Sequence, residues 1–74
     1  MTVQDKAHDT YTAALFDQYG RFMTYPQAAT ETAMSVRTLK RLTAAGNLPC
    51  YSPKGARILR VRTEDIANLM KQVA

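Results

Sequence analysis

The chain has 74 residues, 46% of them hydrophobic, and a formal net charge of +4 at pH 7. A chain of this length buries one small core, so we expect a single domain. Its single cysteine and single histidine exclude an internal disulfide and a zinc site made from these residues. No apolar run is long enough to span a membrane.

The positive charge is concentrated in the middle of the sequence. Residues 32–63 hold seven Lys and Arg residues and no acidic residue, a balance of +7. Residues 1–31 hold two basic and four acidic residues (−2), and residues 64–74 hold one basic and two acidic residues (−1). A block of one sign inside a folded domain favours a polyanionic partner such as nucleic acid.

The pattern predicts a first helix over residues 3–19. Thr2 is available as its N-cap, and Gly20 is a natural C-terminal stop. We expect this helix to pack on the domain; a free helix that binds a partner is the alternative. The expected packing stripe, at helical spacing, consists of Val3, Ala7, Tyr11, Ala14, Leu15 and Tyr19.

After Gly20 a short extended piece leads into a second helix over residues 25–32. Thr24 is its expected N-cap and Gln27 stands at the third helical position, which together make a capping box. Pro26 falls in the first turn, where its missing N–H costs nothing.

A third helix is predicted over residues 36–45. Ser35 is its N-cap, and Gly46 provides the C-terminal stop. At about 100° per residue, the apolar and the basic residues separate onto opposite faces. The core face is expected to hold Val36, Leu39, Leu42 and Thr43, and the outward face Arg37, Lys40, Arg41 and Ala44.

Residues 49–62 change to the period of a β-hairpin. Two strands are predicted, over 49–52 and 57–62, around turn residues 53–56. Alternation does not explain Ile58, which falls on the same side as the arginines. It puts Leu59 and Val61 on one face and Arg60 and Arg62 on the other.

The last predicted helix covers residues 64–73, with Thr63 as its cap. Glu64 and Asp65 lie in its first turn, where the helix dipole favours acidic side chains. A core stripe at i, i+3, i+4 and i+7 consists of Ile66, Leu69, Met70 and Val73.

Two short helices joined by a tight turn, the second with outward cations, are typical of a helix-turn-helix motif, and the basic hairpin would be its wing. Arg37, in the first turn, could reach a guanine in the major groove. Lys40 and Arg41 lie one turn further on, and Lys54 and Arg57 stand at the hairpin tip. The alternative is an ordinary solvated basic surface.

The sequence offers little for catalysis. It has no Gly-rich phosphate loop, no Cys–His arrangement and no metal-ligand spacing. Cys50 is expected to be a small, buried or half-buried thiol, and His8 a surface residue. We therefore expect a protein that is not an enzyme and needs no cofactor or metal.

The stretches "MTYPQAATETAMSVRTLKRLTAAGNLP" and "RVRTEDIANLM" resemble the MerR-like winged-helix domains of phage excisionases and related small DNA-binding proteins. The resemblance covers residues 22–73. Matching positions are the capping Thr24, the pair Ala28 and Ala29, Ser35 and Thr38 at a helix start, Gly46, Leu48 and Pro49 at its exit, and then Arg62, Glu64, Asp65 and Ile66.

This resemblance implies a small α+β winged helix-turn-helix domain over 22–74, preceded by an additional helix in 1–21. It also implies an excisionase, a recombination directionality factor, which acts on DNA in the cytoplasm of a bacterial host. Copies would bind neighbouring sites in a phage attachment region, bend the double-stranded DNA and steer an integrase toward excision. Independently of the resemblance, the apolar stripes of the last helix and of the helix over 3–19 leave no spare seam for a stable dimer, so we expect a monomer in solution that assembles on DNA.

Two alternatives stay open: a small phage transcriptional repressor, and an adaptor whose basic face holds an acidic protein. The expected DNA contacts are Ser35, Arg37, Thr38, Lys40 and Arg41 on the recognition helix and Lys54, Arg57, Arg60 and Arg62 on the wing.

The sequence departs from the family pattern at two places. Glu31 and Thr32 stand where the family usually has aliphatic residues, so the helix over 25–32 is expected to be held less firmly. Residues 1–21 have no counterpart in the minimal pattern.

Overall fold

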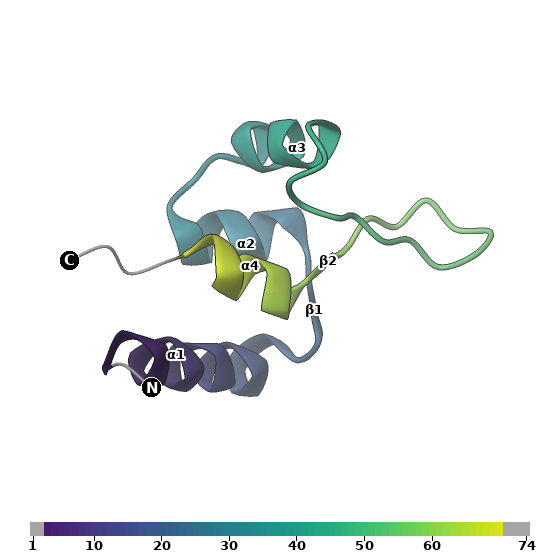
Figure 1. Cartoon of the computed structure of the whole chain (residues 1–74). Helices are drawn as coiled ribbons and strands as arrows, with labels where there is room; N and C mark the ends of the chain where they lie inside the picture. Colours follow the sequence, from purple (N-terminus) through teal and green to yellow (C-terminus); the bar gives the residue numbers. More distant parts are fainter. Residues whose placement is uncertain (1–2, 71–74) are drawn as a thin grey trace.

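The computed structural model describes residues 3–70, with side chains from residue 8 onward. Within that part, four helices and a two-stranded antiparallel sheet form a small α+β fold (Figure 1). The elements are α1 (Val3–Tyr19), β1 (Phe22–Met23), α2 (Tyr25–Thr32), α3 (Val36–Ala44), β2 (Val61–Arg62) and α4 (Thr63–Leu69).

The start of α2 has the predicted capping box. The Gln27 N–H donates to Thr24 Oγ1 (3.1 Å), and the Thr24 N–H donates back to Gln27 Oε1 (2.9 Å). The helix ends at Thr32, and its C-cap Ala33 has a φ of 58°, in the left-handed region. A residue with a Cβ pays a steric cost there, so this short connection to α3 holds some backbone strain.

The ends of α3 are fixed by local hydrogen bonds. Ser35 Oγ accepts from the Thr38 N–H (3.0 Å), as predicted. After the helix, the Gly46 N–H donates to Thr43 O (3.0 Å) and the Asn47 N–H donates to Leu42 O (2.9 Å). This pair of bonds is a Schellman motif, and it requires the positive φ of 83° that Gly46 adopts. The helix ends at Ala44, one residue before the predicted end.

The predicted start of the last helix is wrong by one residue. α4 begins at Thr63, so Arg62 is the N-cap, and no side chain caps the helix. The Thr63 hydroxyl instead donates to Gly20 O (2.6 Å), and its N–H donates to Arg21 O (2.9 Å). The helix ends at Leu69, and the predicted core residue Val73 lies outside the described residues, as does the predicted cap Thr2.

The predicted two-stranded hairpin is also wrong in part. β2 pairs with β1, with Phe22 opposite Arg62 and Met23 opposite Val61. Between the two hairpin arms there is only one bridge, from Tyr51 to Arg60, with N···O distances of 2.7 and 2.8 Å. The rest of the hairpin leaves the body of the protein and meets no further strand that could extend the ladder.

The core lies between α2, α3, the sheet and α4. The exit of α3 also contributes, through Leu48, which has no exposed surface. Val61 is buried in this core, whereas Leu59, which was predicted on the same face, is exposed. The central cluster consists of Met23, Tyr25, Ala28, Leu39, Leu48, Val61 and Ile66.

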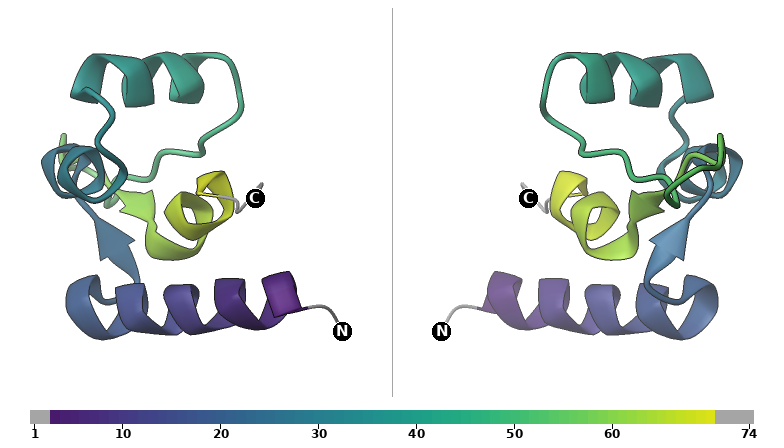
Figure 2. Two further views of the ribbon diagram at one scale, coloured as in Figure 1. Left: turned by 90° about the vertical axis from the view of Figure 1, so that its left-hand side faces the viewer. Right: turned by 90° about the vertical axis from the view of Figure 1, so that its right-hand side faces the viewer.

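Helix α1 packs alongside α4 (Figures 1 and 2). Leu15 is buried there, and His8 is half-buried with Nε2 3.2 Å from Asn68 Oδ1. Ala14, which was predicted on the packing stripe, is exposed. No helix within residues 3–70 is long and apolar enough to cross a lipid bilayer.

Glu31 connects α1 to α2. The Tyr11 and Tyr19 hydroxyls both donate to its carboxylate, at 3.1 and 3.2 Å. Burial, together with the hydrogen bond to Glu31, raises the pKa of Tyr11 to about 12. The neighbouring Thr32 is buried, and its hydroxyl donates to Ala28 O (2.7 Å). The expectation that Glu31 and Thr32 loosen α2 did not take into account the hydrogen bonds that both side chains make.

Candidate nucleic-acid interface

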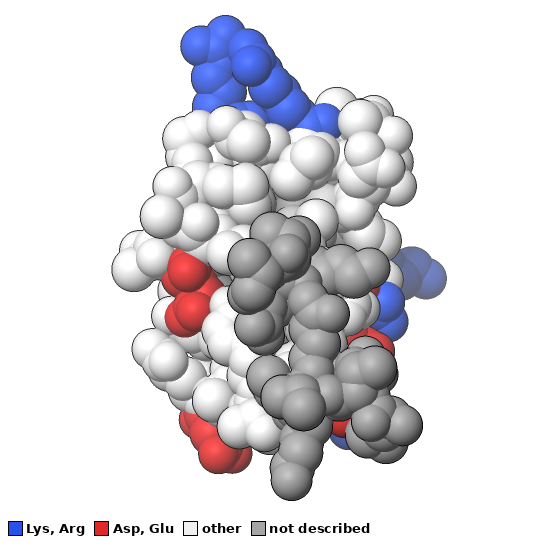
Figure 3. Space-filling model, turned by 60° about the vertical axis from the view of Figure 1, so that its left-hand side comes forward, with Lys and Arg blue, Asp and Glu red and all other residues white. Residues whose placement is uncertain are grey.

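Helix α3 presents its cations on the side away from the core. Leu39 has no exposed surface, and Val36 and Leu42 are half-buried against the core. The basic face, by which we mean Arg37, Lys40 and Arg41, is exposed. Figure 3 shows Lys and Arg gathered at the end of the molecule that α3 forms. The predicted division of this helix into two faces is therefore confirmed.

A shallow depression runs along the basic face. Its volume is about 440 Å³, and it opens widely to solvent. Much of its surface is apolar, although three of its lining residues are cations. Its lining consists of Val36, Arg37, Lys40, Arg41 and Ala44.

The first turn of α3 is held rigidly. Ser35 Oγ accepts the Thr38 N–H and itself donates to Thr38 Oγ1 (2.9 Å). Both of these predicted site residues are exposed, although their hydroxyls are already used in the cap. Their bonds fix the backbone that carries Arg37, so this side chain projects from an ordered helix end.

Lys40 lies over an aromatic ring from α2. Its Nζ is 5.7 Å from the centroid of Tyr25. Tyr25 is only 5% exposed, and its hydroxyl lies 2.7 Å from Thr43 Oγ1 of α3. Burial raises the pKa of Tyr25, so the phenol stays neutral in this position. The sequence pattern alone gave no signal for this contact between α2 and α3.

Residues 52–59 form a loop that extends away from the body, between the bridged residues Tyr51 and Arg60 (Figure 1). We call it the protruding loop. Its tip is a hydrogen-bonded turn in which the Ala56 N–H donates to Pro53 O (3.0 Å). Gly55 has a φ of 81°, as a type II turn requires at its third position. The predicted turn is confirmed at these residues.

The cations of the protruding loop are exposed, and those at its base are engaged in the protein. Lys54 and Arg57 are exposed. Arg60 is half-buried, and its Nη1 donates to Leu59 O (2.9 Å). The predicted site residues of the hairpin are therefore not equivalent.

Arg62 makes the strongest internal contacts of the four. Its Nε and Nη2 donate to the two carboxylate oxygens of Asp65, both at 3.0 Å. Its guanidinium also lies 5.6 Å from the ring centroid of Tyr51. The hydrogen bonds to Asp65 raise the pKa of Arg62. Sequence reasoning missed this pair, although the i, i+3 spacing across a helix start was the signal for it.

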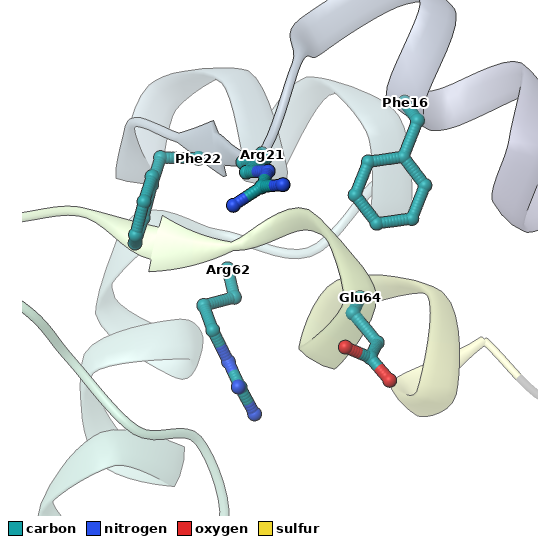
Figure 4. A pocket seen from close by; sticks show the side chains of 5 residues that line it. All are labelled: Phe16, Arg21, Phe22, Arg62 and Glu64. Carbon is teal, nitrogen blue, oxygen red and sulfur yellow. The ribbon is translucent and has the colours of Figure 1, made fainter.

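A second hollow lies away from the basic face. Its volume is about 510 Å³, and it is bounded by side chains of α1, the strands and the first turn of α4 (Figure 4). One wall is Phe22, which makes an edge-to-face contact with Tyr51 at 5.9 Å between ring centroids. The lining residues are Phe16, Arg21, Phe22, Arg62 and Glu64.

Within residues 3–70, no three His, Cys, Asp or Glu side chains lie close enough together to hold a metal ion. Cys50 is half-buried against the core, as expected of a structural thiol.

The architecture is consistent with a small helix-turn-helix-like fold: α2, a tight turn and α3, supported by a short sheet and α4. Neither a scan of protein-family models nor searches of curated proteins and of solved structures found a match to this chain.

Proposed function

We propose that the protein binds double-stranded DNA as a winged helix-turn-helix protein, with α3 as recognition helix and the protruding loop as wing. One observation carries the proposal: the cations of α3 are exposed together, on the side opposite to Leu39, which is completely buried. A helix held this way presents only its basic face, and the major groove of DNA admits an α-helix.

The residues of the basic face are expected to contact different parts of the duplex. Arg37 stands in the first turn, where a recognition helix meets base edges, and its guanidinium suits the two acceptors of a guanine. Lys40 and Arg41 follow one turn later, for bases or phosphates. Next to Arg37, the Thr38 hydroxyl accepts from Ser35 and can itself donate to a phosphate or base oxygen, whereas Ser35 acts mainly through the cap.

The protruding loop positions the protein on the duplex. Lys54 and Arg57 are exposed and suit phosphates or an adjacent minor groove. Arg60 and Arg62 lie at the base of the loop and would meet phosphates only at the edge of the interface. A phosphate contact of Arg62 competes with Asp65, so we assign this residue mainly to supporting the loop.

We further propose that the biological role is that of an excisionase. This step rests on the family resemblance of residues 22–73 and not on the geometry. Copies on neighbouring sites would bend the attachment DNA and recruit or orient an integrase. A transcriptional repressor would use the same contacts, and an adjacent integrase gene would favour excision over repression.

The test is to select duplexes from a random-sequence pool with the protein and measure their affinity by fluorescence anisotropy. We expect enrichment of one sequence and a logarithmic affinity that falls linearly with the logarithm of salt concentration. Arg21→Ala is the matched control, because Arg21 is exposed but lies outside α3 and the loop. No enrichment, or equal losses from Arg37→Ala and Arg21→Ala, would contradict the proposal; binding to acidic protein alone would favour an adaptor.

A further inference from the structure

Two aliphatic side chains are exposed on the protruding loop. Ile58 is 47% exposed and Leu59 is 45% exposed, and Ile58 is the most exposed large hydrophobic residue within the described part of the chain. The alternation of the hairpin did not explain Ile58 and placed Leu59 on the same face as Val61. In the structure the chain returns to the core only at Val61, which is fully buried, so Ile58 and Leu59, which precede it, face solvent.

The surroundings of this pair are basic. Arg57 and Arg60 flank it in sequence, Lys54 stands at the loop tip, and residues 32–63 contain no acidic residue. A purely apolar partner would leave these cations unpaired. Duplex DNA offers a charged surface and an apolar surface close together. Phosphates line the rim of a groove, and the apolar base stack lies inside it.

The loop backbone is already shaped before any partner arrives. Ser52 Oγ donates to Ala56 O (2.7 Å), across the turn closed by Ala56 N–H and Pro53 O. The bridge between Tyr51 and Arg60 fixes the base of the loop. Presenting Ile58 and Leu59 from such a loop lowers the conformational entropy that binding must overcome.

We infer that Ile58 and Leu59 form an apolar wedge that enters the minor groove and partly unstacks one base step, which kinks the duplex. This inference rests on the proposed DNA binding and adds how bending is produced. Unstacking is easiest at pyrimidine–purine steps, so the wedge would select such a step without hydrogen bonds to its bases. Arg57 and Lys54 hold the phosphates on either side while the step opens.

The experiment uses the full chain and a duplex of about 30 bp recovered by the protein from a random pool. 2-Aminopurine replaces adenine at successive positions and brightens where a base loses its stacking. Dyes on the two ends report the bend by energy transfer. The variants are Ile58→Ala with Leu59→Ala, the shape-conserving Ile58→Leu, and the control Phe16→Ala, an exposed apolar residue of α1. Circular dichroism melts check that each variant is folded.

We expect the wild type to brighten one base step several-fold and to kink the duplex by about 20–90°. The double alanine variant should lose the brightening and most of the bend, while the salt dependence stays unchanged because no cation is removed. Its affinity should fall by no more than about tenfold, since the energy of unstacking is no longer spent. Ile58→Leu and Phe16→Ala should behave as wild type.

Three results would overturn the wedge. The first is that the wild type binds the duplex but no 2-aminopurine position brightens. The second is that the double alanine variant keeps the full bend. The third is that the double alanine variant changes the sedimentation of the free protein, because Ile58 and Leu59 would then belong to a contact between copies. Failure of the wild type to bind any duplex would instead overturn the proposed function itself, and the wedge with it.

Discussion

Replacing Glu31 with alanine is expected to lower the free energy of unfolding by about 1 kcal/mol. The carboxylate accepts hydrogen bonds from Tyr11 (3.1 Å) and Tyr19 (3.2 Å), which join α1 to α2. A charge-assisted bond contributes roughly 1.5–3 kcal/mol when buried, and the half-buried setting of Tyr11 reduces its bond to about 1 kcal/mol. The bond from Tyr19 is screened by solvent, so the expected loss rests on Tyr11. For a chain of this size the melting temperature should fall by roughly 4–8 °C.

Thermal and urea unfolding followed by circular dichroism measure this change, and a double-mutant cycle isolates its cause. Tyr11→Phe should cost about 1 kcal/mol in the wild type and nearly nothing in the Glu31→Ala background. Equal costs of Tyr11→Phe in both backgrounds would refute the reasoning, as would an unchanged melting temperature for Glu31→Ala.

The pH dependence gives a second reading of the same contact. The pKa of Tyr11 is raised to about 12 in the folded protein, so the folded state holds this proton more tightly than the unfolded state. The associated stability is complete below the unfolded pKa of about 10 and is lost as the pH rises through 12. Solvent screening of a half-buried group limits it to about 1 kcal/mol. Tyr11→Phe should remove this part of the alkaline loss.

The remaining predictions concern the backbone, the DNA contacts and the association state. Ala33→Gly should stabilise the protein by about 1 kcal/mol, because a left-handed φ of 58° strains alanine; a lower melting temperature would contradict this. Arg37→Ala should weaken specific binding by ~1–3 kcal/mol and relax the preference at one base pair, whereas equal losses on specific and random DNA would make it a phosphate contact only. Reversing the charge of Lys54 and Arg57 should weaken binding to all sequences and flatten the salt slope by ~1 per lost contact, and an unchanged slope would mean that the loop does not reach DNA. The free protein should sediment as a monomer and add copies with DNA length, and a stable dimer without DNA would refute that.

The helices around the tight turn could be predicted from the sequence because their signals are local. Thr24 with Gln27, and Ser35 with Thr38, act within one turn of each helix. Gly46 similarly marks the end of α3 through its own backbone conformation. The two faces of α3 follow from helical spacing alone, which is why the basic face was predicted correctly.

The sheet could not be predicted because its pairing is not local. The alternating pattern of residues 57–62 predicted a strand of a hairpin, but Val61 pairs with Met23, which lies far away in the chain. A single sequence does not tell which of two extended segments a strand will meet. Leu59 was therefore predicted to share a face with Val61 but is exposed, because the pairing with β1 begins only at Val61.

The contacts of polar side chains were missed for a related reason. Helical spacing placed Tyr11 and Tyr19 on the packing face of α1, yet it carries no information on what their hydroxyls meet. Glu31 lies 12 and 20 residues further along the chain, and only the packing of α1 against the domain brings the three together. Glu31 and Thr32, which were expected to hold α2 less firmly, therefore both make hydrogen bonds in the folded protein.

The most direct test of the DNA-binding surface is a titration of the ¹⁵N-labelled protein with a selected duplex, followed by NMR. We predict that the largest shifts and broadening fall on the backbone amides of residues 35–41 and of the protruding loop, while those of α1 change little. Shifts concentrated on α1 and on the hollow lined by Phe16 and Phe22, with α3 unaffected, would contradict the account.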